Sequence, residues 1–310
     1  MIKRTLYFGN PAYLSLQNHQ MIIKLPEVET NLGLPDILKK EAQVSIPVED
    51  IGLVVIDHQR ITITQGLMAK LFANNTVMIW CDENHLPTGI STALVGNDTF
   101  TEKVNHQLNA SEPLRKQLWK QTIEAKISNQ AKVMELLGCN GMVLRHLSEN
   151  VNSGDPENKE GRAAARYWEA LLGPYQVNRG QHEAPPNNFF NYGYAILRAI
   201  IARSLIGSGC LPSIGIHHHN KYNAYCLADD IMEPYRPVVD LHIFQYLQTL
   251  SHLPEVLTKE HKQEMLKIPQ LDITIDGKQS PLMVGCQRTT ASLAKCYAGE
   301  SRKLLYPTIN

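Results

Sequence analysis

What is missing from this sequence narrows its class before any motif is considered. Its 310 residues contain 30 Lys+Arg and 30 Asp+Glu, so it lacks the excess positive charge of the simplest nucleic-acid-binding proteins. The six cysteines form no Cys-x-x-Cys pair, which excludes a zinc ribbon and a disulfide framework and predicts reduced, mostly buried thiols. The longest apolar stretch, 192–207, is interrupted by Arg198 and Arg203, so no membrane span is expected. We therefore expect a globular cytoplasmic protein with a sizeable core.

The sequence also lacks the short motifs that mark most cofactor-dependent and covalent enzymes. It has no Gly-x-Gly-x-x-Gly after a strand, no Walker loop, no Gly-x-Ser-x-Gly elbow and no zinc-deaminase signature. Dinucleotide, P-loop and serine-nucleophile chemistry thereby lose their expected marker.

The periodicity of apolar residues changes near residue 96. Before it, short β-branched or aromatic runs separated by turn residues predict a small sandwich or roll. The expected strands are 4–9, 13–16, 21–25, 44–48, 53–57, 61–64 and 76–80, with a helix at 65–73. Beyond it, helices are expected at 114–137, 161–172, 187–205, 238–250 and 282–298, with a hairpin at Gly277. The predicted fold is α+β: a β-rich N-terminal domain (1–95) followed by a larger all-α domain (96–310).

The densest polar segment, residues 215–237, combines imidazole and carboxylate groups. Its members are His217, His218, His219, Asp229, Asp230 and Glu233. Such a set suits Mg²⁺ or Mn²⁺. Consecutive side chains point in different directions, so at most one or two of the histidines share a site. Asp230 and Glu233 share a face if their turn is helical, which Pro234 makes conditional. The alternative is a solvated histidine loop followed by acidic helix caps.

A second candidate is Glu160, at the start of an expected helix. A carboxylate there is also favoured simply by the helix dipole. Gly161 and the alanines at 163–165 leave a surface that another backbone can approach closely. Arg162 and Arg166 lie four residues apart on one face, which suits a phosphate backbone.

Two weaker basic groups complete the candidates. The first lies along the helix at 114–137 and comprises Arg115, Lys116, Lys120 and Lys126. Interleaved Glu124 and glutamines favour a solvated face there. The second lies near the C-terminus and comprises Arg288, Lys295, Arg302 and Lys303.

Several of these residues lie within longer motifs that resemble those of a known family. Gly215-Ile-His-His218, followed by Asp230-Ile-Met-Glu233-Pro-Tyr-Arg-Pro-Val-Val-Asp240, resembles the signature of the CRISPR-associated adaptation integrase, the metal-dependent endonuclease of spacer acquisition. The chain is most similar to the type II form, over residues 1 to about 300. Further motifs that match in order are Arg4-Thr-Leu-Tyr7, Ile46-Pro-Val-Glu-Asp-Ile51, Trp80-Cys-Asp-Glu-Asn-His85-Leu-Pro87, Lys126-Ile127 with Gln130, Glu160-Gly-Arg162 and Asn191-Tyr-Gly-Tyr194.

The resemblance implies a site and a cofactor. Glu160, His218 and Glu233 match the family's metal ligands, His218 because it stands 15 residues before Glu233. Asp230 matches an additional acidic position, and the ion implied is Mg²⁺ or Mn²⁺. Residues suited to contact DNA are Arg162, Arg166, Arg236, Arg288 and Lys295.

The resemblance also implies a reaction and partners. A 3′-hydroxyl of a double-stranded foreign DNA fragment attacks a phosphodiester of the CRISPR repeat, as part of antiviral defence. The family implies a homodimer, with the N-terminal domain as its dimerisation domain, which assembles with a small companion adaptation protein. Because the net charge is zero, we expect a basic DNA surface only in that assembly.

Three other functions compete with integration. The chain is alternatively a metal-dependent nuclease of branched DNA, a non-catalytic DNA-binding scaffold, or a protein that senses soft metals through His217–His219.

Overall fold

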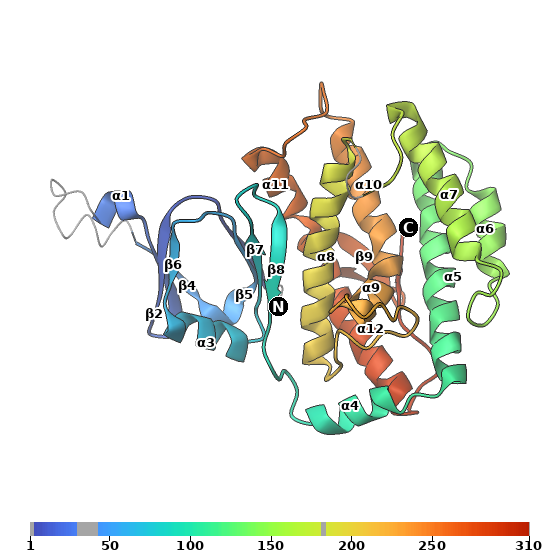
Figure 1. Ribbon diagram of the computed structural model, residues 1–310, viewed down its shortest axis with the longest axis horizontal. Helices are drawn as coiled ribbons and strands as arrows, with labels where there is room; N and C mark the ends of the chain where they lie inside the picture. The colour runs from blue at the N-terminus through green and yellow to red at the C-terminus, as the bar shows by residue number, and fades with distance from the viewer. Residues whose placement is uncertain (1–2, 30–42, 181–183, 310) are drawn as a thin grey trace. The chain divides into compact units, whose positions relative to one another are not determined.

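The computed structural model describes residues 3–29, 43–180 and 184–309, and the chain divides into two compact units, Met1–Gly96 and Asn97–Asn310 (Figure 1). The N-terminal unit is built on two four-stranded sheets. The first has the order β1 (Arg4–Phe8), β5 (Ile51–Ile56), β7 (Val77–Cys81) and β8 (Pro87–Ser91). The second has the order β4 (Val44–Pro47), β3 (Gln20–Lys24), β2 (Ala12–Gln17) and β6 (Ile61–Ile63).

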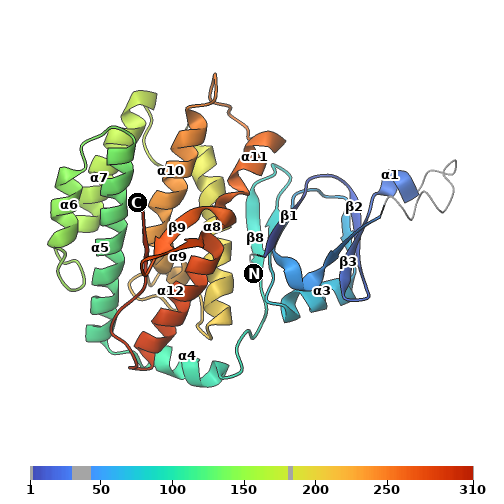
Figure 2. The ribbon, with the colours of Figure 1, turned by 180° about the vertical axis from the view of Figure 1, so that it is seen from behind.

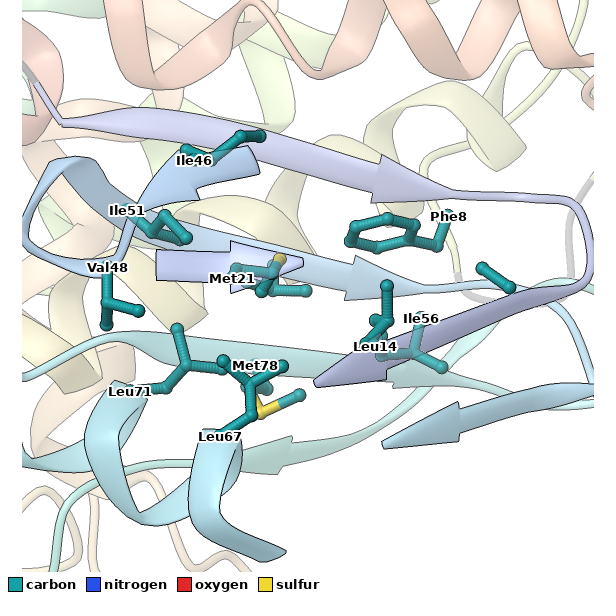
Figure 3. Packing of buried hydrophobic residues seen from close by; sticks show 12 residues of the cluster. Phe8, Leu14, Met21, Ile46, Val48, Ile51, Ile56, Leu67, Leu71 and Met78 are labelled. Carbon is teal, nitrogen blue, oxygen red and sulfur yellow. The ribbon is translucent and has the colours of Figure 1, made fainter. Parts of the chain in front are cut away.

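The core of this unit lies between the sheets. Strand β5 pairs in parallel with both β1 and β7 and is buried at every residue, which explains its unbroken apolar run. Figure 3 shows Ile51 and Met78 of the first sheet packed with Met21 and Leu14 of the second. Helix α3 (Gln65–Ala73) adds Leu67 and Leu71. The short elements α1 (Pro26–Glu29) and η1 (Val48–Asp50) connect strands.

The sequence predictions for this unit are confirmed with one addition. Each of the seven expected strands corresponds to one of β1–β7, and the expected helix is α3. Strand β8, which pairs antiparallel with β7, was missed because its Pro87 and Gly89 are typical of turns.

The C-terminal unit is mostly helical. Its α-helices are α4 (Phe100–Leu108), α5 (Glu112–Leu136), α6 (Met142–Glu149), α7 (Lys159–Leu172), α8 (Asn187–Gly207), α9 (Cys226–Met232), α10 (Arg236–Leu247), α11 (Lys259–Met265) and α12 (Leu282–Tyr297). Its 3₁₀ turns are η2 (Gly173–Tyr175), η3 (Glu233–Tyr235) and η4 (Ile268–Gln270). Helix α8 is the centre, packed against α9, α10, α11 and α12 (Figure 2). Helix α5 packs against α6, α7, α10 and η3.

The expectation of an all-α domain is incomplete for this unit. It also contains a three-stranded sheet with the order β10 (Lys278–Pro281), β9 (Asp272–Ile275) and β11 (Pro307–Thr308). The β9–β10 hairpin was expected, and its turn holds Asp276 and Gly277 at positive φ. Strand β11 is two residues long and pairs with β9, more than thirty residues away along the chain, so no local sequence pattern predicts it.

Two further expectations concern membranes and cysteines. Within the described ranges, no helix is both long and apolar enough to cross a membrane. All six cysteines are free thiols; four are buried, and Cys81 and Cys139 are half-buried, as predicted.

Candidate active site

Glu160 lies in the first turn of α7, but it is not the group that caps this helix. The Asn158 side chain accepts a hydrogen bond from Gly161 N at 3.1 Å. The carboxylate of Asp155 accepts from the backbone N–H groups of Lys159 and Glu160, at 2.9 Å each. A Cβ at Gly161 would stand 2.7 Å from the Asn158 amide, so glycine makes room for the cap. Because other residues satisfy the helix N-terminus, the Glu160 carboxylate is available for other contacts.

The three histidines lie on a loop that is organised by Asp230 of α9. The Asp230 side chain is fully buried and accepts from the backbone N–H of Ile216 at 2.6 Å, His217 at 2.9 Å and His218 at 3.3 Å. The His218 ring adds a fourth contact through Nδ1, 2.5 Å from Asp230 Oδ1. Gly215 permits this wrapping, because a Cβ there would overlap the His218 carbonyl and lie 2.9 Å from Asp230 Oδ2.

This loop conformation gives the three histidine rings different environments. A carboxylate only accepts, so Nδ1 of His218 carries the proton and Nε2 of the neutral ring is an acceptor for another group. The Asp230 hydrogen bond raises the pKa of His218, to which the Glu233 and Glu160 charges add. His217 instead lies flat on the Trp119 ring, with centroids 4.2 Å apart, and burial lowers its pKa. His219 is exposed.

Glu233 lies at the corner between α9 and α10. Despite Pro234, its backbone stays in the right-handed helical region, so Asp230 and Glu233 occupy adjoining helical turns. Its side chain is 5% exposed, with Arg236 Nη2 3.1 Å from Oε1. Burial raises the pKa of this carboxyl, but Arg236 and Lys126 outweigh it and the net pKa is lowered. Glu233 is therefore held as a buried carboxylate.

Lys126 of α5 joins the two glutamates. Its Nζ lies 2.6 Å from Glu160 Oε1 and 2.6 Å from Glu233 Oε2, with the lysine side chain only 10% exposed. Burial opposes its charge, but the Glu233 and Glu160 carboxylates prevail and raise the pKa of the ammonium. The solvated face expected for this helix is correct for Lys116 and Lys120, which pair with Glu112 and Glu124 one turn away. It is wrong for Lys126, which points into the site.

A third buried carboxylate, Asp240 of α10, is linked to the site through Tyr194 and Arg236. Asp240 accepts from Tyr167 OH at 2.9 Å and from Tyr194 OH at 2.5 Å. Burial raises its pKa to about 7 despite these hydrogen bonds. The Arg236 guanidinium lies over the Tyr194 ring at 4.8 Å, which connects this pair of tyrosines to Glu233.

The remaining charged candidates divide between the site and the surface. Arg162, Arg166 and Lys295 are exposed, as a DNA-contacting role requires. Arg236 is turned toward Glu233 and Tyr194, and Arg288 binds the Ile275 carbonyl and Asp276. The sequence placed Asp229 in the polar cluster, but its carboxylate pairs with Arg198 of α8 at 2.7 Å.

The donor set suits a hard divalent ion, although a cationic side chain lies within it. Two carboxylates and one imidazole are ligands typical of Mg²⁺ or Mn²⁺. Glu233 Oε2 is buried, and its partner is the Lys126 ammonium at 2.6 Å, so this oxygen already lies against a positive charge. In the part of the chain that the structure describes, no three His, Cys, Asp or Glu side chains converge as a ready metal cage. Instead, the ammonium of Lys126 lies against both glutamates.

Comparison with known proteins places the chain in a family. Residues 8–268 match the family described as CRISPR associated protein Cas1. A CRISPR-associated endonuclease Cas1 from Neisseria meningitidis serogroup C is 33% identical over 98% of this chain and 95% of its own length. Among solved structures, a casposase bound to integration product superposes with a TM-score of 0.76 at 17% identity, covering 98% of this chain and 92% of that one. A chain of a Cas6-RT-Cas1–Cas2 complex gives 0.72 at 17% identity, over 100% of this chain and 36% of that one.

These likenesses agree with the arrangement of the site. The structural matches, at low identity, show the shared fold: a β-sheet region followed by a mostly helical region. The family match spans the α7 start, the histidine loop and the α9–α10 corner, where the candidate residues lie. The resemblance expected from the sequence motifs is thereby confirmed, and the chain belongs to the Cas1 family of CRISPR-associated endonucleases and integrases.

Proposed function

We propose that this chain joins the 3′-hydroxyl ends of double-stranded DNA fragments to CRISPR repeat DNA, using Mg²⁺ or Mn²⁺ held by Glu160, His218 and Glu233. The observation that carries the proposal is the convergence on one buried ammonium of two carboxylates 73 residues apart in sequence. The His218 ring lies close enough for both to raise its pKa.

Each residue has a distinct task in this reaction. A divalent ion bound there lowers the pKa of the attacking hydroxyl and offsets charge on the phosphate. Glu160 and Glu233 supply oxygen ligands, and His218 supplies Nε2. We assign Asp230 to orientation rather than ligation, because its oxygens already receive the donors of the histidine loop. The new P–O bond forms as the old one breaks, so no covalent protein intermediate is needed.

The partners follow from the same proposal. One structural neighbour is a casposase bound to integration product and another belongs to a Cas6-RT-Cas1–Cas2 complex, which supports DNA and a companion protein as partners here. We propose that the β-rich unit mediates a homodimer, and that exposed Arg162, Arg166 and Lys295 contact DNA in the assembly. With a net charge of zero, the monomer alone binds DNA weakly in this view.

Strand transfer by ligand variants tests the function. We expect Glu160→Gln, His218→Ala and Glu233→Gln each to lower joining of a labelled fragment into a repeat-containing plasmid by more than about a hundredfold. Glu169→Gln, on the exposed side of the same helix as Glu160, is the matched control and retains joining. Circular dichroism verifies that each variant is folded.

The other functions predict different outcomes. Joining at the normal rate by His218→Ala contradicts the ligand assignment, and His219→Ala measured beside it identifies which histidine matters. Nicking of branched DNA without joined product indicates a nuclease. Absence of divalent-ion binding in calorimetry indicates a scaffold, and preferential binding of Cu²⁺ or Zn²⁺ indicates a metal sensor.

A further inference from the structure

Lys126 has an environment unlike that of the other charged residues on its helix. It is anchored on α5 and buried, and its ammonium bridges two carboxylates from separate elements at equal distances of 2.6 Å. On the same helix, Lys116 is exposed and Lys120 is half-exposed, and each pairs with a glutamate one turn away. A buried ammonium is costly unless it is paired, so these two contacts hold it in place.

The charges around Lys126 balance without any added ion. Glu160 and Glu233 carry two negative charges, and Lys126 and Arg236 carry two positive charges in contact with them. A divalent ion that binds Glu160 Oε1 and Glu233 Oε2 takes the two oxygens that now hold the ammonium, so it competes with Lys126. Arg236 contacts the other oxygen of Glu233, so it does not compete for the same atom.

We propose that Lys126 is a built-in counter-ion that stands in for the divalent ion: it holds Glu160 and Glu233 together in the free protein and, by competition, weakens their affinity for metal. Lys126 is therefore a positioning residue of the site. The inference rests on the proposed function, since it assumes that the two glutamates are metal ligands. It adds that the metal affinity of the isolated chain is set by a residue that is not itself a ligand.

The proposal has a structural consequence for each state. Without metal, the ammonium offsets the repulsion between the buried Glu233 carboxylate and the partly buried Glu160 carboxylate, so its removal destabilises the fold. With metal bound, the ion would offset this repulsion instead, so a variant without the Lys126 charge would recover stability. Loss of Lys126 and addition of metal are thus coupled.

Calorimetry with Mn²⁺ alone, without DNA, tests this coupling. We expect Lys126→Met to bind Mn²⁺ about tenfold more tightly than the wild type, within the usual range of such couplings. Lys126→Arg keeps the positive charge and shows no such gain. Lys120→Met, which removes a surface lysine of the same helix, leaves the affinity unchanged.

Thermal unfolding provides the second readout. In a chelator, Lys126→Met melts below the wild type, and Mn²⁺ raises its Tm by more than it raises that of the wild type. If Lys126→Met does not fold even with Mn²⁺, Lys126→Gln takes its place in both measurements.

The outcomes separate this inference from the function on which it rests. If the folded, uncharged Lys126 variants bind Mn²⁺ no more tightly than the wild type does, the inference is overturned and the proposed ligands remain intact. An equal gain in Lys126→Arg also overturns it, because charge would then not be the cause. Failure of both the wild type and Lys126→Met to bind Mn²⁺ overturns the ligand set and this inference together.

Discussion

Among the described residues, each unit contains a half-exposed histidine paired with a fully buried aspartate. In the N-terminal unit, His85 Nδ1 lies 2.9 Å from Asp57 Oδ1, with the histidine side chain 54% exposed. In the C-terminal unit, His218 Nδ1 lies 2.5 Å from Asp230 Oδ1, with the histidine 46% exposed. Both aspartates also receive further donors, Tyr7 OH for Asp57 and backbone N–H groups for Asp230.

The difference lies in what surrounds each pair. Tyr7 donates to Asp57 at 2.5 Å, and burial together with that aspartate raises the tyrosine pKa. The charges of Glu160 and Glu233 act on His218. A phenol adds a hydrogen bond but no second negative ligand, whereas two carboxylates complete a set for a divalent ion. A histidine–aspartate pair therefore becomes a candidate metal site only through its neighbours.

Replacing the aspartate of each pair is expected to give the largest difference, measured as Mn²⁺ affinity and strand transfer. In Asp230→Asn, an amide group faces the N–H donors of the histidine loop, so His218 loses its orientation. We expect Mn²⁺ affinity and strand transfer to fall about 10–100-fold. Asp57→Asn is the matched change in the other unit and leaves Mn²⁺ affinity, measured by calorimetry, at the wild-type value. Equal losses in both variants contradict the distinction.

Adding one methyl group to a glycine beside each pair gives a smaller difference. The new Cβ of Gly215→Ala meets the His218 backbone carbonyl, which cannot move without shifting the loop. We expect a cost of about 1–3 kcal/mol in chemical denaturation. In Gly9→Ala the Cβ meets the Tyr7 ring at 2.6 Å, and this side chain can rotate away by giving up its hydrogen bond. A larger cost for Gly9→Ala reverses the expected order.

The pH dependence of stability gives the smallest effect. The pKa of His218 is raised in the folded state, so its contribution to stability is complete below the unfolded pKa and is lost as pH rises through the folded one. Because the ring is 46% exposed and screened, we expect a loss of less than about 1 kcal/mol. Subtracting the pH–stability profile of His218→Gln from that of the wild type isolates the His218 contribution. Asp240, with a pKa of about 7, titrates in both proteins and therefore cancels. If the stability difference between the wild type and His218→Gln increases with pH, the prediction is contradicted.

Much of the fold was predictable because its elements carry strong local patterns. The central helix α8 and the buried strand β5 have long apolar runs, and α5 repeats apolar residues at helical spacing. Short elements without such a pattern, such as α9 and β11, were missed. Strand β11 depends entirely on pairing with β9, and pairing partners distant in sequence leave no periodic signal.

The sequence named the residues of the candidate site but not the contacts that they make. Consecutive histidines left open which of them acts, and Asp230 separates them by binding the His218 ring while Trp119 stacks on His217. Glu160 looked equally suitable as a helix cap, and the caps proved to be Asn158 and Asp155.

The sequence by itself determined the two-part α+β organisation, the chemistry of the donor groups and, through its long motifs, the family. Only the tertiary structure decided that Lys126 lies between Glu160 and Glu233, which are 34 and 107 residues away along the chain. The physical reason is that periodicity reports which side of a helix is buried, not which charges it meets there. Those charges come from other elements, and their pairing exists only once α5, α7 and the α9–α10 corner have packed together.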